Sequence, residues 1–129
     1  MNILVLHGPN INLIGKFSSN NITRDKIDKA LRKSAHQMGH DLVIFHFIEE
    51  SKYVRQIQRR RKNIDGIIFN PGALCNSCFV IKELLQIIDL PFIEIHISDI
   101  PDSKANFDSS ILQSIATDRI FNEPIPAYQ

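Results

Sequence analysis

Residues 65–73 read Asp-Gly-Ile-Ile-Phe-Asn-Pro-Gly-Ala, a short apolar run that ends abruptly in an Asn-Pro-Gly turn. Its apolar part, Gly66–Phe69, has three counterparts along the chain: Ile3–Leu6, Leu42–Phe47 and Phe92–Ile97. Large aliphatic and aromatic residues follow one another in these runs instead of alternating with polar ones. This pattern is typical of strands that are buried on both faces, as in parallel sheets covered by helices. The sequence therefore predicts an α/β fold.

Segments with helical spacing separate these runs. In Thr23–Gly39, apolar residues recur at steps of three and four, Thr23 is a suitable N-cap, and Gly39 suits a left-handed C-terminal residue. The apolar face of this helix is expected to comprise Ile27, Ala30, Leu31, Ala35 and Met38. Further helices are expected at Ser51–Lys62 and Asn76–Ile88. Strands and helices that alternate with right-handed crossovers predict a doubly wound parallel sheet with helices on both faces, a three-layer α/β/α architecture.

The third of these helices, capped by Asn76 or Ser77, has an unusually wide apolar face. Its core face is expected to comprise Phe79, Val80, Leu84, Ile87 and Ile88, and Ile81 and Leu85 widen it. Either a contact between subunits or packing under a loop would account for the excess. After Ile100, residues 101–106 are expected to form a loop, and Ser110–Ile120 predicts either a short strand or a helix.

Length and composition restrict the class of protein. A chain of 129 residues with 43% apolar residues is expected to form one domain, residues 1–129, around one core. The net charge of +1 gives no reason to expect nucleic acid or an anionic membrane as a partner. The N-terminal apolar run is too short for a signal peptide, and no run is long enough to span a membrane. The expected location is the cytoplasm.

Three predicted strands end in polar residues and turns. The first leads into His7-Gly-Pro-Asn10, the third into Asn70-Pro-Gly, and the fourth into His96-Ile-Ser98. Ligands of open parallel sheets bind at the carboxyl ends of the strands, so these residues are expected to meet at one site. His96 follows a buried strand and is the candidate acid or base. His36, His40 and His46 are interpreted as structural.

At these residues the chain resembles the type II 3-dehydroquinate dehydratases. The matching stretches run from Leu6 to Gly15, from Asp65 to Ala73 and from Pro91 to Ser98, and together with Glu50 they are colinear over nearly the whole chain. The resemblance implies a flavodoxin-like fold with five parallel strands and a homo-oligomer, a trimer or a dodecamer built from trimers. It also implies dehydration of 3-dehydroquinate, a step of the shikimate pathway, through an enolate and without a metal or an organic cofactor.

The resemblance assigns roles to individual residues. His96 corresponds to the catalytic acid, and Asn10 to the asparagine that orients the base. Asn70 corresponds to the asparagine that positions the substrate near a water that stabilises the enolate. Ile97 and Ser98 correspond to the turn that binds the substrate carboxylate, and Asn76 stands where the family has a substrate-binding histidine. Glu94 is expected to fix the hydrogen bonds of the site.

Several positions depart from the family pattern. The family carries an arginine and a catalytic tyrosine on the loop after the first motif, whereas Gly15–Thr23 is shorter and contains neither. The two tyrosines, Tyr53 and Tyr128, do not map to the base, and the terminal helix of many members is missing from this sequence. An aromatic residue is replaced by Leu74 and a substrate-binding arginine by Asp108. These departures predict a degenerate active site.

Two hypotheses follow from the retained and missing residues. In the first, the protein is a divergent dehydratase in which His96 is the acid and an unidentified base, from this chain or from a neighbouring subunit, completes the site. In the second, it is catalytically inactive and acts as a binding or assembly protein. Lys16 is the one residue of the loop that could replace the missing cation or, with a strongly lowered pKa, the base.

Two further patterns have ordinary structural interpretations. Cys75-Asn-Ser-Cys78 is interpreted as two small buried side chains, with thiol redox chemistry and metal binding as the alternatives. The pair lacks the four ligands of a closed zinc site, so no metal is expected. The basic run Arg59–Lys62 is interpreted as a solvated helix end, not as an RNA-binding patch.

Overall fold

A computed structural model describes residues 1–16 and 22–123 of the chain, and within them it contains one five-stranded parallel sheet. The strands are β1 (Asn2–His7), β2 (Asp41–His46), β3 (Gly66–Asn70), β4 (Phe92–Ile97) and β5 (Asp118–Asn122). Their spatial order is β2-β1-β3-β4-β5, and all neighbours are parallel. The four predicted strands are confirmed to within one residue at each end. The undecided segment Ser110–Ile120 contains the start of β5.

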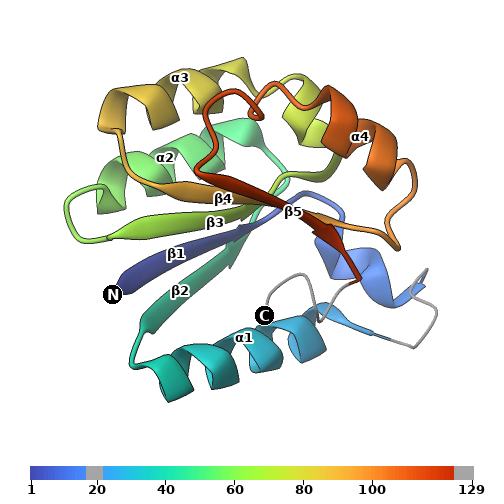
Figure 1. Cartoon of the computed structure of the whole chain (residues 1–129), viewed down its shortest axis with the longest axis horizontal. Helices are drawn as coiled ribbons and strands as arrows, with labels where there is room; N and C mark the ends of the chain where they lie inside the picture. The colour runs from blue at the N-terminus through green and yellow to red at the C-terminus, as the bar shows by residue number, and fades with distance from the viewer. Residues whose placement is uncertain (17–21, 124–129) are drawn as a thin grey trace.

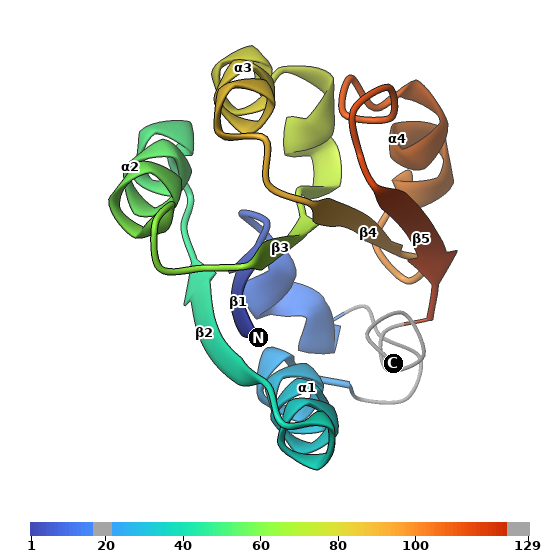
Figure 2. The same ribbon diagram turned by 60° about the vertical axis from the view of Figure 1, so that its left-hand side comes forward.

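Helices cover both faces of the sheet. They are α1 (Arg24–Met38), α2 (Glu50–Arg60), α3 (Phe79–Ile88) and α4 (Ser103–Ser109), with two 3₁₀ helices, η1 (Ile11–Lys16) and η2 (Gly72–Asn76). Figures 1 and 2 show α2, α3 and α4 on one face and α1 with η1 on the other. The doubly wound, three-layer flavodoxin-like architecture predicted from the sequence is therefore confirmed.

The core lies in two layers, one on each face of the sheet. Leu4 and Leu6 of β1 pack with Tyr53 of α2 in the first layer, whereas Val5 between them packs with Ile27 of α1 in the second. Successive side chains of a strand point to opposite faces, so a strand covered on both sides needs apolar residues at every position. This explains why the strand sequences are continuous apolar runs.

The boundaries of α1 agree with the sequence prediction. Thr23 precedes the helix in an extended conformation, and its Oγ accepts a hydrogen bond from the Lys26 amide at 3.3 Å. Gly39 follows it at φ +75°, the left-handed region that favours glycine. The predicted apolar face is wrong at its end, because Met38 is 69% exposed. Met38 instead lines a groove beside the sheet that the described residues leave open.

The third predicted helix is wrong in its start and in its face. Instead of beginning at Asn76, the chain first forms η2, and α3 begins at Phe79. Its buried residues are Ile81, Leu84 and Leu85, whereas three residues expected on the core face are exposed, namely Phe79, Val80 and Ile87. The 3₁₀ turn rotates the helix relative to the sequence prediction. Since most of its residues are apolar, the sequence did not distinguish the two faces.

The prediction that residues 101–106 form a loop is wrong in part, because α4 begins at Ser103. This seven-residue helix lacks apolar periodicity and begins after Asp102, which has φ +58°. It contacts η2, where Asn106 and Ser109 bond to Asn76, and β4, where the ring of Phe107 lies against His96. Tertiary packing, not local sequence, therefore determines this helix.

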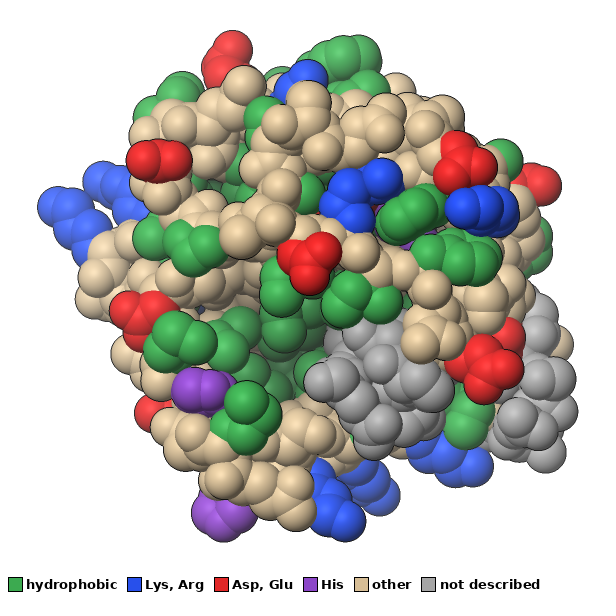
Figure 3. Space-filling model, in the orientation of Figure 1, with side chains coloured by type: hydrophobic (Ala, Val, Ile, Leu, Met, Phe, Trp, Pro, Cys, Tyr) green, Lys and Arg blue, Asp and Glu red, His purple; other side chains and the backbone are tan. Residues whose placement is uncertain are grey.

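The described residues cover only part of the sheet face that carries α1. A groove of about 280 Å³ runs beside α1 and is lined mainly by apolar side chains, among them Ile68, Ile93, Ile95 and Ile120. Figure 3 shows this hollow as a concentration of hydrophobic side chains. Within residues 1–16 and 22–123, no helix has both the length and the apolar character needed to cross a membrane.

Candidate functional site

A pocket of about 390 Å³ opens at the carboxyl ends of β1 and β3. The turn after β1 forms one wall, the turn after β3 forms the second, and the segment that leads into and through α4 forms the third. The lining residues are Gly8, Pro9, Asn10, Ile11, Leu13, Asn70, Pro71, Gly72, Ala73, Leu74, Ile100, Pro101 and Asn106. The pocket lies where the strand order reverses, as the general rule for open parallel sheets predicts.

The two turns approach each other closely because Gly8 has no side chain. A Cβ at this position would lie 2.6 Å from the Asn70 carbonyl oxygen and 2.8 Å from that of Pro71. On the other side, Nε2 of His46 donates a hydrogen bond to the Pro9 carbonyl at 2.9 Å. These contacts place Asn10 and Asn70 in the same pocket, where both were predicted to lie.

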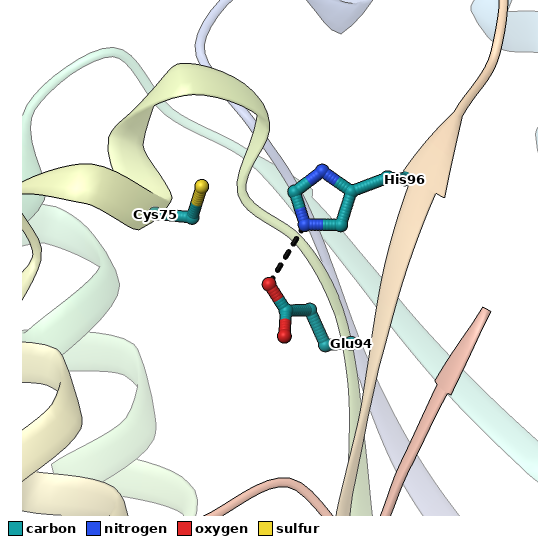
Figure 4. Close-up of side chains that lie close together, drawn as sticks. All are labelled: Cys75, Glu94 and His96. Carbon is teal, nitrogen blue, oxygen red and sulfur yellow. Dashed lines mark hydrogen bonds and ion pairs between the residues drawn. The ribbon is translucent and has the colours of Figure 1, made fainter. Parts of the chain in front are cut away.

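His96 lies beside this pocket but does not line it. Its side chain is only 1% exposed, and its Nε2 lies 2.7 Å from Oε2 of Glu94, two residues earlier on β4 (Figure 4). The ring of Phe107 meets the imidazole edge to face, with centroids 5.6 Å apart. The predicted catalytic acid is therefore buried between a carboxylate and an aromatic ring.

Arg119 of β5 completes this cluster. Its Nε donates to Oε1 of Glu94 at 2.8 Å, a second guanidinium nitrogen donates to the Phe107 carbonyl, and the guanidinium carbon lies 4.0 Å from the Phe107 ring centroid. Burial by itself raises the pKa of the Glu94 carboxyl, but hydrogen bonds from His96, Ser110 and Arg119 outweigh it and hold this pKa below its usual value of 4.5. Glu94 is therefore an anion with both oxygens bonded. The sequence analysis missed Arg119, since nothing in the sequence connects a residue of β5 with the site.

Ile97 and Ser98, predicted to bind a substrate carboxylate, lie at the end of β4 and directly after it. Ile97 is fully buried, and neither residue lines the pocket. The Ser98 amide donates to the Asn122 carbonyl at 2.8 Å, and the Ser98 carbonyl accepts from the Ser103 hydroxyl at 3.2 Å. Because β5 pairs with β4 up to this point, the Ser98 amide is already bonded within the protein.

The side chain of Asn76 forms hydrogen bonds with other side chains of the protein. Its Nδ2 donates to Oδ1 of Asn106 at 2.9 Å, and its Oδ1 accepts from the Ser109 hydroxyl at 2.7 Å. Asn106 lines the pocket, whereas Asn76 does not. The sequence predicts a loop for residues 101–106, so it did not indicate that Asn106 would line the pocket.

No tyrosine in the described part of the chain can act as a base in the pocket. The hydroxyl of Tyr53 is buried 2.5 Å from the His7 carbonyl and 2.6 Å from that of Phe47, and burial raises its pKa to about 12. Lys16, considered above as a substitute, is an exposed residue at the end of η1 and does not line the pocket. Residues 17–21 and Tyr128 lie outside the described residues.

Among the described residues, Cys75, Glu94 and His96 offer ligand atoms within 4.8 Å of one another (Figure 4). A thiol, a carboxylate and an imidazole are a possible ligand set for zinc. However, both Glu94 oxygens are already bonded, and the guanidinium of Arg119 supplies a compensating positive charge. Burial also raises the pKa of the Cys75 thiol, which disfavours the thiolate that a metal requires. The arrangement therefore fits an ion-pair network better than a metal site.

The thiols also lack the properties of a redox pair. Cys75 and Cys78 are both free and buried, and burial raises the pKa of Cys78 to about 12. A reactive thiol of a redox pair has a lowered pKa, whereas burial raises the pKa of both Cys75 and Cys78. The interpretation of these cysteines as small buried side chains fits the structure.

Comparison with known proteins identifies the family. The family model "Dehydroquinase class II" matches residues 1–129. The 3-dehydroquinate dehydratase of Herminiimonas arsenicoxydans is 34% identical over 131 aligned positions, which cover 98% of this chain and 90% of that protein. The type II dehydroquinase of Butyrivibrio crossotus superposes with a TM-score of 0.87 at 25% identity and covers 99% of this chain and 92% of that one. The chain therefore belongs to the class II dehydroquinase family and is a type II 3-dehydroquinate dehydratase-like protein.

Proposed function

We propose that this protein retains the ligand pocket of its family but has a degenerate active site that binds a small molecule without dehydrating 3-dehydroquinate at an enzymatic rate. Dehydration needs a base beside the ketone, donors for the enolate oxygen, and an acid that reaches the departing hydroxyl. The pocket offers Asn10 and Asn70 as hydrogen-bonding groups but no described base. Binding therefore has more support than catalysis.

The observation that carries this proposal is the position of His96. A general acid must come within hydrogen-bonding distance of the group it protonates. His96 is 1% exposed, lies under Phe107, and has its Nε2 bonded to Glu94. Because His96 does not line the pocket, a substrate held there would not touch the imidazole in this arrangement. Loss of a positioned acid or base costs about 10²–10⁴-fold in rate, and both are affected here.

A second candidate function is a divergent dehydratase that keeps the family reaction, with the base supplied by a neighbouring subunit. It is favoured by the His96–Glu94 pair, which lies next to a pocket that contains Asn10 and Asn70. A homo-oligomer, a trimer or a dodecamer, is part of this proposal, as is a cytoplasmic location. The exposed apolar residues Phe79, Val80 and Ile87 on α3 support a contact between subunits.

An assay of the purified protein with 3-dehydroquinate distinguishes the two functions. Formation of the conjugated enone of 3-dehydroshikimate is followed by its ultraviolet absorbance, and binding is measured by calorimetry on the same sample. We expect no turnover above that of the His96→Ala variant. Turnover by the wild type that is lost in His96→Ala would instead establish the divergent dehydratase and overturn the binding role.

A further inference from the structure

The near-neutral charge of the chain conceals a strong separation of charges along it. Residues 1–62 contain twelve lysines and arginines but five acidic residues, whereas residues 63–129 contain three lysines and arginines and nine acidic residues. Half of the basic residues in the first part belong to α2 and to the turn that follows it. Exposed charges are screened over about 8–10 Å at physiological salt, so a partner responds to local charge more than to the net charge of +1.

The cations of α2 lie along one side of the helix. Lys52, Arg55 and Arg59 follow one another at steps of three and four residues, the spacing that aligns side chains on one helical face. With a rise of 1.5 Å per residue, they extend over about 10 Å of the helix axis. Lys62 follows in the turn after α2, and all four side chains are exposed. We call these four residues the α2 basic surface.

The charges of the α2 basic surface are not compensated by ion pairs. Within residues 1–16 and 22–123, none of its four residues is ion-paired. The two neighbouring arginines differ, because both are bonded within the protein. Nε of Arg60 donates to Oε1 of Gln56 at 3.1 Å, and Nη1 of Arg61 donates to a backbone carbonyl at 2.5 Å. Figure 3 shows lysine and arginine side chains projecting on the left, where the turn after α2 lies in Figure 1.

The exposed side of α2 restricts the class of partner. Besides its cations it exposes Ser51 and Gln58, whereas its apolar side chains, Tyr53, Val54 and Ile57, are buried or half-buried. A helix on a membrane surface needs an exposed apolar face, and a protein interface usually has an apolar or aromatic centre. Single-stranded nucleic acid is usually bound by aromatic side chains that stack on its bases. A row of cations without such groups fits a row of phosphates best.

We propose that the α2 basic surface docks on the phosphate backbone of a nucleic-acid duplex. A duplex carries one charge per about 1.7 Å of its axis, so a row of cations about 10 Å long meets several phosphates. In the sequence, Arg59–Lys62 by itself indicates a solvated helix end, whereas the structure adds Lys52 and Arg55 on the same side. None of these residues lines the pocket, so this interaction is separate from the proposed binding of a small molecule.

Fluorescence anisotropy of a labelled DNA duplex measures the contact and its dependence on salt. Neutralisation of about three phosphates predicts a slope of about −3 when the logarithm of the association constant is plotted against that of the sodium chloride concentration. Two duplexes of unrelated sequence should bind equally, because contacts with phosphates do not read bases. No change in anisotropy at about 0.1 mM protein in low salt would overturn the proposal.

A matched pair of double variants locates the contact. Arg55→Gln/Arg59→Gln should weaken duplex binding at least about tenfold at low salt and change the slope to about −1. Lys29→Gln/Lys33→Gln removes two exposed cations with the same spacing from α1, on the other face of the sheet, and should keep the wild-type slope. Arg55→Lys/Arg59→Lys should keep it too, because the positive charge remains. Equal losses in the two glutamine variants would show that α2 is not the contact.

Two further measurements test other partners for the same surface. Cosedimentation with phosphatidylserine vesicles, without duplex binding, would assign the surface to a membrane. Salt-sensitive self-association that is lost in Arg55→Gln/Arg59→Gln, again without duplex binding, would assign it to a second copy of the chain. Either result would overturn the proposal. Loss of duplex binding in this variant, with unchanged small-molecule binding in the pocket, would support it.

Discussion

The carboxyl ends of β1 and β3 form an open pocket, whereas those of β4 and β5 are closed by side chains packed on one another. Gly8, a proline turn and short amides leave space at the first pair of strands. At the second pair, Phe107 packs against His96, and Arg119 lies over the Phe107 ring and is bonded to Glu94. Residues of the family motifs are present at both places, Asn10 and Asn70 at the first and His96 at the second. Whether a motif residue can contact a ligand therefore depends on the side chains packed around it.

The closed end is held by charges and the open end by backbone geometry, so mutations should affect them differently. Glu94 is fully buried and depends on Arg119 and His96 as partners. The pocket walls depend on the close approach of two turns at Gly8. Changes at the first group should mainly alter stability and its pH dependence, and changes at the second should alter the pocket.

The largest effect is expected for Arg119→Met. Removing one partner of a buried pair leaves the Glu94 carboxylate uncompensated, which should reduce the free energy of unfolding by about 3 kcal/mol in urea denaturation. The control is Lys104→Met, because Lys104 and Asp108 are 64% and 60% exposed, and surface pairs contribute about 0–1 kcal/mol. Equal losses in the two variants would show that the closed end does not depend on its charges.

The same pair predicts the pH dependence of stability. The pKa of Glu94 is lower in the folded state than its usual value of 4.5, so its contribution is fully present above that pH. It is lost as the pH falls through the folded-state pKa, where the carboxylate becomes protonated. We expect the free energy of unfolding to fall more steeply below pH 4.5 in the wild type than in Glu94→Gln. Parallel curves for the two proteins would contradict this.

A smaller effect, at the open end, is expected for Gly8→Ala. The added Cβ would lie 2.6 Å from a backbone oxygen of Asn70, which cannot move as a side chain could. The two turns must separate, at a cost of about 2 kcal/mol in unfolding free energy and with weaker ligand binding. Gly66→Ala is the control, since its Cβ would lie at an ordinary 3.4 Å from the Pro91 carbonyl. A stable Gly8→Ala protein with wild-type binding would refute the close approach.

The smallest effect is expected for Tyr53→Phe. The phenol hydroxyl lies at the His7 and Phe47 carbonyls, and its loss should reduce the free energy of unfolding by about 1 kcal/mol. Ligand binding in the pocket should not change, because Tyr53 does not line it. Alkaline titration of tyrosine absorbance should lose the component with a pKa of about 12 in this variant. A change in ligand affinity would instead link Tyr53 to the open end.

Local patterns predicted most of the fold because they act over a few residues. The strands were found from continuous apolar runs, and α1 from its Thr23 cap and Gly39 terminus. The errors occurred where packing outweighs local preference. In α3, apolar residues on every side hid which face is buried, and α4, which lacks apolar periodicity, packs on η2 and β4, both distant in sequence.

Sequence alone determined the chemical types available to this protein: two asparagines and two histidines at strand ends, and neither tyrosine nor arginine in the loop from Gly15 to Thr23. Only the tertiary structure decided their accessibility. Asn10, Asn70 and Asn106 line the pocket, whereas His96 is buried against Phe107. The reason is physical, because hydrogen-bond partners and burial come from residues distant in sequence, such as Arg119, whose contact with Glu94 exists only once β5 pairs with β4.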